Sequence, residues 1–379
     1  MNKVRYEVLV GDNRETIKSL PDQSVNTVVT SPPYFGLRDY GTATWEGGSA
    51  DCNHMRDSKV GDSTSTGHKG MDDKGHAVGD AIYKDVCKKC GAVRKDSQIG
   101  LEETPEDYVQ TMVELFREIR RVLRNDGTVW LNIGDSYAGS GKGRNSDGSP
   151  NVDENSKQAT SKGTTEGALQ KMKMGGDLKQ KDLIGIPWML AFALRADGWY
   201  LRQDIIWNKP NPMPESVKDR CTKAHEYIFL LSKSKSYYYD YEAIKEEATG
   251  ERWGGDTPIN MNNTKDTDNV FSGLTRPRKM LYDKRNKRSV WTVTPKSFKG
   301  AHFATFPPEL IEPCILAGCP EGGTVLDPFG GSGTTAGVAY LHDRNSILCE
   351  LNPEYVEMVE RRIEGIIEGK RTLGATLPL

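Results

Sequence analysis

Asp327-Pro-Phe-Gly-Gly-Ser-Gly-Thr-Thr335 carries the strongest structural signal in this chain of 379 residues. The apolar run 324–326 precedes it and a helical pattern over 334–342 follows it, so the stretch predicts a strand, a tight turn and a helix. Glycines let the backbone of such a turn adopt positive φ and approach a ligand closely. The amino end of the helix favours a carboxylate or phosphate. We expect a nucleotide-like ligand to be held by Asp327, Pro328, Phe329, Gly330, Gly331, Ser332, Gly333 and Thr334.

Glu350 strengthens this expectation. It ends the next predicted strand, over 346–350, where a carboxylate can accept hydrogen bonds from both hydroxyls of a ribose. Without that acid, chain reversal alone would explain a glycine-rich turn. The turn and the acid together predict a nucleotide-binding corner in an open α/β sheet.

The second informative stretch is Thr30-Ser-Pro-Pro-Tyr34, which closes the β-branched run 25–30. Proline cannot continue a central strand, so a loop is predicted at the strand's carboxyl end, where ligands bind in such sheets. Ser31 offers a side-chain acceptor, Pro32 a backbone carbonyl and Tyr34 a ring for stacking, while Pro32 and Pro33 stiffen the loop. The alternative is a plain Pro-Pro turn at the end of a strand.

The α/β pattern is strong at both ends of the chain and weak between them. Helices are predicted over 104–123, 187–196, 307–317, 334–342 and 353–368, and strands over 6–10, 25–30, 128–133, 199–207, 226–231, 324–326 and 346–350. Residues 41–100, 138–182 and 245–290 are polar and lack apolar periodicity. The pattern indicates one α/β core that is assembled from both ends and interrupted by polar insertions.

The composition is that of a globular protein, with 36% hydrophobic residues, 27% charged residues and a formal net charge of −2. No apolar run is long enough for a membrane span. Seven cysteines without a secretory leader indicate a reducing compartment, so we expect the cytoplasm. Seven Lys or Arg residues lie in 276–288 against the single acid Asp283. This basic run is either a solvated loop or a contact to a polyanion.

The insertion 41–100 holds four candidate zinc ligands: Cys52, His54, Cys87 and Cys90. The spacing Cys-x-x-Cys lets both thiolates of a knuckle reach one ion, and the glycine that follows permits the turn. His68 or His76 is an alternative to His54, and unligated thiols are the alternative to a metal. A structural ion would stabilise an insert that has little core of its own.

The two informative stretches resemble the motifs of the amino-methylating DNA methyltransferases. In that family (Ser/Asp/Asn)-Pro-Pro-(Tyr/Phe) is the catalytic tetrapeptide, which 31–34 matches, and Phe-x-Gly-x-Gly holds S-adenosylmethionine, which 329–333 matches. Here the catalytic motif comes first, which resembles the β-group order, a circular permutation of the common Rossmann-like fold. The resemblance covers 8–40, 104–136, 185–240 and 290–360, and it also implies cofactor contacts by Asp12 and Thr305.

The resemblance implies an architecture of four parts. Residues 1–40 and 101–207 would form the catalytic half of the core and 291–379 the cofactor-binding half, with 41–100 as a zinc-knuckle-like insert and 208–290 as the target-recognition region. Arg and Lys of the basic run would contact phosphates and guanine edges of double-stranded DNA. We expect the loop 138–182 to close over DNA. A cognate restriction enzyme, and assembly as monomer or dimer, stay open.

The implied reaction transfers a methyl group to the exocyclic amine of a base swung out of the duplex. Ser31 in the first motif position is similar to cytosine-N4 enzymes, and adenine N6 is the alternative. A remote alternative is a non-catalytic zinc-bearing DNA-binding protein, which would not need the turn 327–335. Protein glutamine methyltransferases place Pro-Pro-Tyr after the cofactor motif. Cys314 lies among apolar residues of a predicted helix, so we do not expect cytosine-C5 chemistry through a thiolate.

Overall fold

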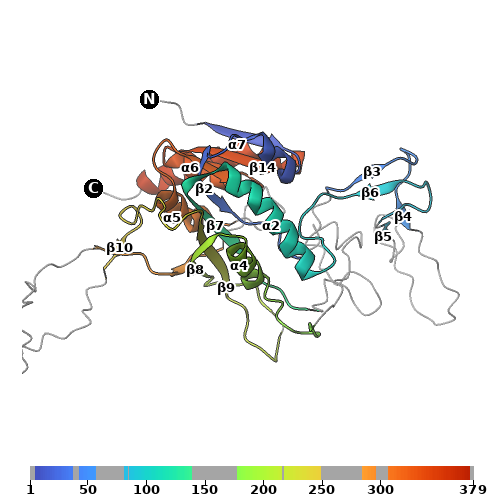
Figure 1. Ribbon diagram of the computed structural model, residues 1–379, viewed down its shortest axis with the longest axis horizontal. Coiled ribbons are helices and arrows are strands. Elements are labelled where there is room, and N and C mark those ends of the chain that lie inside the picture. The colour runs from blue at the N-terminus through green and yellow to red at the C-terminus, as the bar shows by residue number, and fades with distance from the viewer. Residues whose placement is uncertain are drawn as a thin grey trace, which may run out of the picture.

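A sheet of eight strands forms the centre of the molecule (Figure 1). The computed structural model describes residues 5–36, 42–56, 81–83, 85–138, 177–215, 217–248, 284–295 and 306–375. In spatial order the strands are β1 (Tyr6–Val10), β14 (Asn345–Glu350), β13 (Thr324–Asp327), β2 (Val25–Thr30), β7 (Leu123–Ile133), β9 (His225–Ser232), β8 (Tyr200–Asn208) and β12 (Val290–Thr292). Neighbouring strands run parallel except β9, which is antiparallel to β7 and β8.

The middle of the sheet joins the two ends of the chain. β2, from the first 30 residues, pairs with β13, where Thr27 lies opposite Val325. From β13 the sheet continues through β14 to β1, and from β2 it continues through β7 in the opposite direction. This α/β fold, in which the stretch 31–34 precedes the stretch 327–335 along the chain, confirms the fold expected from the sequence.

Helices cover both faces of the sheet. The helical elements are α1 (Asn13–Thr16), the 3-10 helix η1 (Ile17–Ser19), α2 (Pro105–Val122), α4 (Ile186–Ala196), α5 (Pro308–Gly318), α6 (Thr334–Leu341) and α7 (Pro353–Ala375). One apolar core lies between the sheet and α2 with α4, and a second lies between the sheet and α5 with α6. Helix α2 begins where the sequence predicts: Thr104 caps it by accepting from the Asp107 N–H at 3.1 Å, and Pro105 occupies the first turn.

Two boundaries differ from the sequence-based expectation. The strand expected from Thr128 begins at Leu123, because Leu123 already pairs with Val25. The register then shifts before the next pair, Thr27–Thr128. Helix α7 continues past residue 368 to Ala375. Its buried Val359 and Ile363 pack with α6, which anchors the helix over the β14 side of the sheet.

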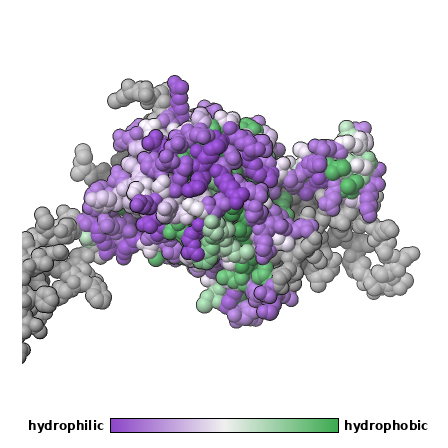
Figure 2. All heavy atoms as spheres, in the orientation of Figure 1, coloured by the Kyte–Doolittle hydropathy of each residue, from purple (hydrophilic) through white to green (hydrophobic). Residues whose placement is uncertain are grey.

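The insert 41–100 contains two small antiparallel sheets, formed by β3 (Thr44–Glu46) with β6 (Val93–Lys95) and by β4 (Met55–Arg56) with β5 (Ala81–Ile82). These four strands lie apart from the core, at the right of Figure 1. A further pair, β10 (Glu246–Glu247) with β11 (Lys284–Arg285), lies in the region 208–290. Figure 2 shows a largely hydrophilic face with an apolar patch around α4. Within the described ranges, no helix has the length and apolarity needed to cross a membrane.

Candidate active site

The sheet changes its direction of winding between β13 and β2, and the ends of these two strands lie side by side. Asp327 ends β13 and Thr30 ends β2, and the Thr30 hydroxyl donates to the Asp327 carboxylate at 2.7 Å. In open α/β sheets a ligand crevice lies outside the carboxyl ends of the strands at such a point. The structure therefore brings the stretches 31–34 and 327–335 together at one edge of the sheet.

Asp327 is buried and connects the two stretches. Its carboxylate accepts hydrogen bonds from Thr30 Oγ1 at 2.7 Å, from Thr335 Oγ1 at 2.6 Å and from the Phe329 N–H at 3.1 Å. Burial raises the pKa of Asp327 to about 6, although the three donors oppose that shift. Because internal donors occupy the carboxylate, Asp327 holds the turn against the strand that leads to the tetrapeptide.

The glycine-rich turn is packed on one side and open on the other. A Cβ at Gly330 would lie 2.7 Å from a side chain of β14, and one at Gly333, whose φ is +87°, would lie 2.8 Å from α7. A Cβ at Gly331 would meet no atom closer than 3.9 Å, so this glycine leaves room for a ligand. The Ser332 hydroxyl is buried and finds no hydrogen-bond partner among the described residues. A ligand in the turn would provide one.

Glu350 closes the other side of this corner. Its carboxylate accepts from the N–H groups of Gly331 and Asn352, each at 2.8 Å. Burial raises the pKa of Glu350 to about 7, and the negative charge of Asp327 adds to the shift. The acid therefore stands beside the turn and is hydrogen-bonded to its backbone.

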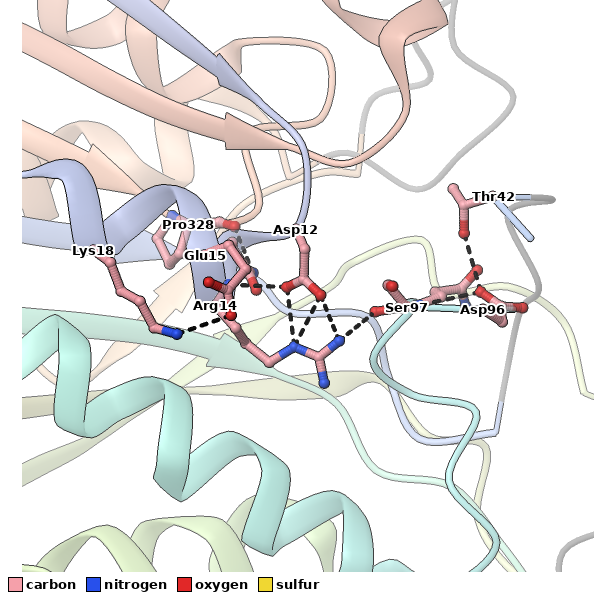
Figure 3. Close-up of polar contacts among 10 residues, drawn as sticks. Asp12, Arg14, Glu15, Lys18, Thr42, Asp96, Ser97 and Pro328 are labelled. Atoms are coloured by element: carbon pink, nitrogen blue, oxygen red, sulfur yellow. Dashed lines mark hydrogen bonds and ion pairs between the residues drawn. The ribbon is translucent and has the colours of Figure 1, made fainter. Parts of the chain in front are cut away.

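The loop after β1 completes the corner. Asn13 is buried and donates its side-chain amide to the Pro328 carbonyl at 2.8 Å. Asp12 caps α1 and forms an ion pair with Arg14 at 2.6 Å (Figure 3). Burial raises the pKa of Asp12, but the hydrogen bonds from Arg14 outweigh that effect and hold the pKa below its ordinary value. Asp12 thus stays ionised after β1, next to the strand that ends in Glu350.

The tetrapeptide 31–34 is held by its neighbours on α2 and β7. The Tyr108 hydroxyl donates to the Pro33 carbonyl at 3.0 Å, and Pro32 is buried. A Cβ at Gly134, just after β7, would lie 2.6 Å from the Tyr34 ring. The absence of a side chain at this glycine therefore allows the aromatic ring to lie against the end of the strand.

Tyr34 is joined to two charged residues that the sequence did not single out. Its hydroxyl donates to Glu226 Oε2 at 2.6 Å, and Glu226 is itself paired with Lys209. Burial raises the pKa of Tyr34 well above its ordinary value, and the Glu226 carboxylate raises it further. The Tyr34 side chain is therefore a neutral phenol whose orientation is fixed by Glu226, and it does not act as a base.

Glu226, Lys209 and Tyr108 were missed because no local motif marks them. Glu226 lies on β9 and stands 192 positions from Tyr34 in the sequence. It reaches the tetrapeptide only because β9 runs antiparallel to β7, which puts Tyr227 opposite Ile133. The sequence does place two polar residues, His225 and Glu226, at the start of a predicted strand. Such a pattern is too common to identify Glu226 as part of a site.

The four candidate metal ligands converge in the insert. One ligand atom from each of Cys52, His54, Cys87 and Cys90 lies within 4.8 Å of the others. The sulfurs of Cys52 and Cys87 are 3.7 Å apart, and the Cys90 sulfur lies 3.6 Å from His54 Nδ1. The alternatives His68 and His76 fall outside the described residues.

Other expected features are placed differently or not at all. Thr305, most of the loop 138–182 and the basic residues 276–279 fall outside the described residues. In the described end of the basic run, Arg285 and Arg288 both pair with Glu246, at 2.9 and 2.6 Å, so these two side chains point to the protein. Cys314 is buried in α5, and burial raises the pKa of its thiol, as befits a packed residue.

Comparisons with known proteins agree with this geometry. A family model described as DNA methylase, N6_N4_Mtase, matches residues 25–361. Type II methyltransferase M.SmaI of Serratia marcescens is 41% identical over 94% of this chain and 90% of its own length. M.Cfr9I of Citrobacter freundii is also 41% identical, over 94% of this chain and 86% of its own length.

Among solved structures, one titled PvuII DNA methyltransferase (cytosine-N4-specific) matches with a TM-score of 0.53. At 16% identity, over 97% of this chain and 93% of that one, the match shows a shared fold. The family match spans most of the chain, and the relatives match over nearly their whole length. The chain therefore belongs to the N6_N4_Mtase family of DNA methylases, and it is an amino-methylating DNA methyltransferase.

Proposed function

We propose that this enzyme transfers a methyl group from S-adenosylmethionine to the N4 amino group of cytosine in double-stranded DNA. The observation that carries the proposal is the hydrogen bond between Thr30 and Asp327, which sets the tetrapeptide 31–34 beside the glycine-rich turn. A cofactor in the turn and a base at the tetrapeptide would then meet at one edge of the sheet. Family membership supports this arrangement of the two motifs.

The corner around the turn fits S-adenosylmethionine, which supplies a reactive methyl group on a sulfonium. Glu350 would accept hydrogen bonds from the ribose hydroxyls, and Asp12 would border the adenine. The buried Ser332 hydroxyl and the open face of Gly331 leave a polar contact and space for the bound group. Thr305 is proposed to border the methionine end.

The tetrapeptide would hold the target base. Ser31 or the Pro32 carbonyl accepts a hydrogen bond from the amine, which directs the nitrogen lone pair toward the methyl group. The ring of Tyr34 stacks on the base after it leaves the duplex. The amine attacks the methyl carbon in line and loses its proton afterwards, so the residues contribute position and electrostatic stabilisation.

The choice of cytosine rests on Ser31 as the first residue of the motif. The protein with the similar fold that is titled cytosine-N4-specific acts on that base. The test is nucleoside mass spectrometry of unmethylated duplex DNA incubated with the enzyme and labelled S-adenosylmethionine. Labelled N4-methylcytosine is the expected product. Labelled N6-methyladenine would overturn the choice of base, and label in protein but not in DNA would overturn the substrate class.

The affinity for S-adenosylmethionine is expected to rise with pH up to about 7. Only ionised Glu350 can accept from both ribose hydroxyls, and the pKa of its carboxyl is about 7 without ligand. Binding must therefore displace a proton at low pH. By linkage, the Kd at pH 5.5 should exceed that at pH 8 by about 30-fold. Calorimetric titration at both pH values measures it.

Glu350→Gln is the control for this pH effect. The variant carries no titrating carboxyl at the ribose, so its weaker binding should change little between pH 5.5 and 8. A wild-type affinity that is equal at the two pH values would contradict the assignment of Glu350 to the ribose.

Several further parts of the proposal concern partners and location. Region 208–290 is assigned to target recognition, with contacts from basic residues other than Arg285 and Arg288, which pair with Glu246. A cognate restriction enzyme is the expected partner, because the relatives carry the name Type II methyltransferase.

We propose that the reaction takes place in the cytoplasm, where DNA lies and where thiols stay reduced. Zinc is a second bound group, held by the Cys/His cluster of the insert apart from the methyl-transfer edge.

A further inference from the structure

Two distances within the Cys/His cluster match those of a tetrahedral zinc site. With Zn–S bonds of about 2.3 Å and a Zn–N bond of about 2.05 Å, tetrahedral angles separate two sulfurs by about 3.8 Å and a sulfur from a nitrogen by about 3.6 Å. The sulfurs of Cys52 and Cys87 are 3.7 Å apart, and Cys90 Sγ lies 3.6 Å from His54 Nδ1. A disulfide would need about 2.05 Å between sulfurs. Both distances fit a zinc site of three thiols and one imidazole, and all four ligand atoms lie within 4.8 Å of one another.

The backbone around the cluster is shaped to present these ligands. The N–H of Gly91, with φ at +79°, donates to the Cys87 carbonyl at 2.7 Å, which closes the knuckle turn. A Cβ at Gly48 would lie 2.7 Å from Cys90 Sγ, so only glycine fits behind this sulfur. The His54 ring is stacked on Trp45 at 4.2 Å between centroids, which fixes the ring orientation as supporting contacts do in metal sites.

A short continuous segment, 91–100, leads from the knuckle Cys87–Cys90 to the loop that carries the tetrapeptide 31–34, here called the catalytic loop. Strand β6, directly after the knuckle, pairs with β3 and leads into 96–100. Arg94 and Asp96, at the end of β6, form an ion pair at 3.2 Å whose side chains are 9% and 15% exposed. The Asp96 carboxylate also accepts from Thr42 Oγ1 at 3.3 Å, which ties the segment to the start of the insert (Figure 3). It accepts from the Gln98 N–H at 3.1 Å as well, which fixes the turn within the segment.

Gly100, at the end of this segment, contacts the backbone of the catalytic loop. Its carbonyl accepts from the Gly36 N–H at 2.7 Å. A Cβ at Gly100, whose φ is +99°, would lie 3.3 Å from the carbonyl oxygens of both Pro33 and Tyr34. Ile99, next to it, is 4% exposed in the main core. The segment 96–100, which follows β6, thus forms one wall of the loop that carries Pro33 and Tyr34.

We infer that a zinc ion bound by Cys52, His54, Cys87 and Cys90 fixes the segment 96–100 and thereby positions the catalytic tetrapeptide. The inference rests on the proposed methyl transfer for its kinetic consequence, and on the cluster alone for the metal. Two of the ligands follow β3 and the other two precede β6, so the ion closes the end of the antiparallel pair that leads into the rest of the insert. Without the ion, the β3–β6 pair would lose this closure, and a strand pair of this size is only marginally stable by itself. The contacts at Ile99 and Gly100 would then hold the segment without support from the insert.

The cofactor corner is affected less. The carbonyl of Ser97 accepts from Arg14 at 3.2 Å, but Asp12 is also held by its own cap to α1 (Figure 3). Loss of zinc should therefore lower kcat more than it lowers the affinity for S-adenosylmethionine.

The first measurement is zinc content by plasma mass spectrometry on the full chain purified without chelator. We expect about one zinc per chain in the wild type and in Cys221→Ser, which removes an exposed cysteine outside the cluster. Cys90→Ser should lose zinc. Thiolate-to-cobalt charge-transfer bands after Co²⁺ exchange should appear in the wild type and be absent from Cys90→Ser. A wild type that neither contains zinc nor takes up added Zn²⁺ would overturn the metal site, whatever its activity on DNA.

The second measurement separates the positioning effect from a general loss of folding. In Cys90→Ser, kcat for DNA methylation should fall about 10- to 100-fold, the range expected when a reacting group is displaced by about 1 Å. The Kd for S-adenosylmethionine should change less than threefold, which also shows that the core is folded. If Cys90→Ser loses zinc and keeps kcat, positioning by zinc is wrong.

Gly100→Ala tests the wall without touching the metal. The added methyl group presses on the Pro33 and Tyr34 carbonyls, so kcat should fall while zinc stays at about one per chain. Gly322→Ala is the matched control, because Gly322 also has a positive φ, +73°, and a Cβ there meets no atom within 4 Å. Gly100→Ala with the kcat of Gly322→Ala would overturn the contact between wall and loop. A wild type that binds zinc but methylates no DNA would sink the proposed function and leave the metal site standing.

Discussion

Tyr34→Ala is expected to lower kcat for DNA methylation about 100-fold, because it removes the ring on which, in our proposal, the extruded base stacks. Stacking of a base on an aromatic side chain contributes about 1–3 kcal/mol, and loss of position at the reacting amine adds to that. The ring lies against Gly134, and its hydroxyl is fixed by Glu226 at 2.6 Å, so its orientation is set before DNA binds. The measurement is single-turnover methyl transfer to duplex DNA, with cofactor affinity determined separately.

Tyr34→Phe is the matched control for this prediction. It keeps the stacking face and loses only the hydroxyl, which leaves Glu226 with Lys209 as its charged partner. We expect kcat to fall less than about tenfold, the cost of one hydrogen bond that orients the ring. If Tyr34→Phe were as slow as Tyr34→Ala, the hydroxyl would carry the effect and the stacking role would be wrong.

The sequence located seven of the eight strands of the central sheet, its main helices and both motifs, because each is encoded locally. It did not locate β12 or the short strand pairs of the insertions. The β-branched run before Ser31 and the apolar run before Asp327 could each be identified from a few neighbours. The contact between them could not, since Thr30 and Asp327 are 297 positions apart and meet only once β2 pairs with β13. The ends of two parallel strands can be predicted, but which strands are neighbours depends on the whole topology.

Charged residues outside the motifs were the hardest to assign. Arg285 and Arg288 belong to a basic run whose composition is compatible with a solvated loop or with a contact to a polyanion. Both side chains pair with Glu246, which no local pattern connects to them. His54 could not be separated from His68 and His76 by spacing alone. Its convergence with the three cysteines became evident only from the fold of the insert. Pairing of charges across distant segments depends on tertiary geometry, which a sequence pattern does not contain.

Asp327→Ala is expected to have the largest effect on folding and on cofactor affinity together. It leaves the Phe329 N–H and the hydroxyls of Thr30 and Thr335 without their acceptor in a buried place. Unsatisfied buried donors cost about 1–3 kcal/mol each, and the hydroxyls can turn to other acceptors, so we expect a loss of about 3 kcal/mol in the free energy of unfolding. The turn that we propose to hold S-adenosylmethionine is then released, and the Kd for this cofactor should rise at least tenfold. Urea unfolding and calorimetric titration measure the two effects.

Asp327→Asn separates the hydrogen bonds from the charge. The amide is neutral, its oxygen accepts from two donors, and its NH₂ can donate to one threonine hydroxyl. Burial raises the pKa of Asp327 to about 6 in the folded chain, above its value in the unfolded chain. The folded state therefore holds the proton more tightly, and the stability from this group is full below about pH 4 and falls as pH rises to about 6. The unfolding free energy of wild type minus that of Asp327→Asn should fall over that interval and stay constant above it. A difference that rose with pH would mean that the three donors lower the pKa of Asp327 more than burial raises it.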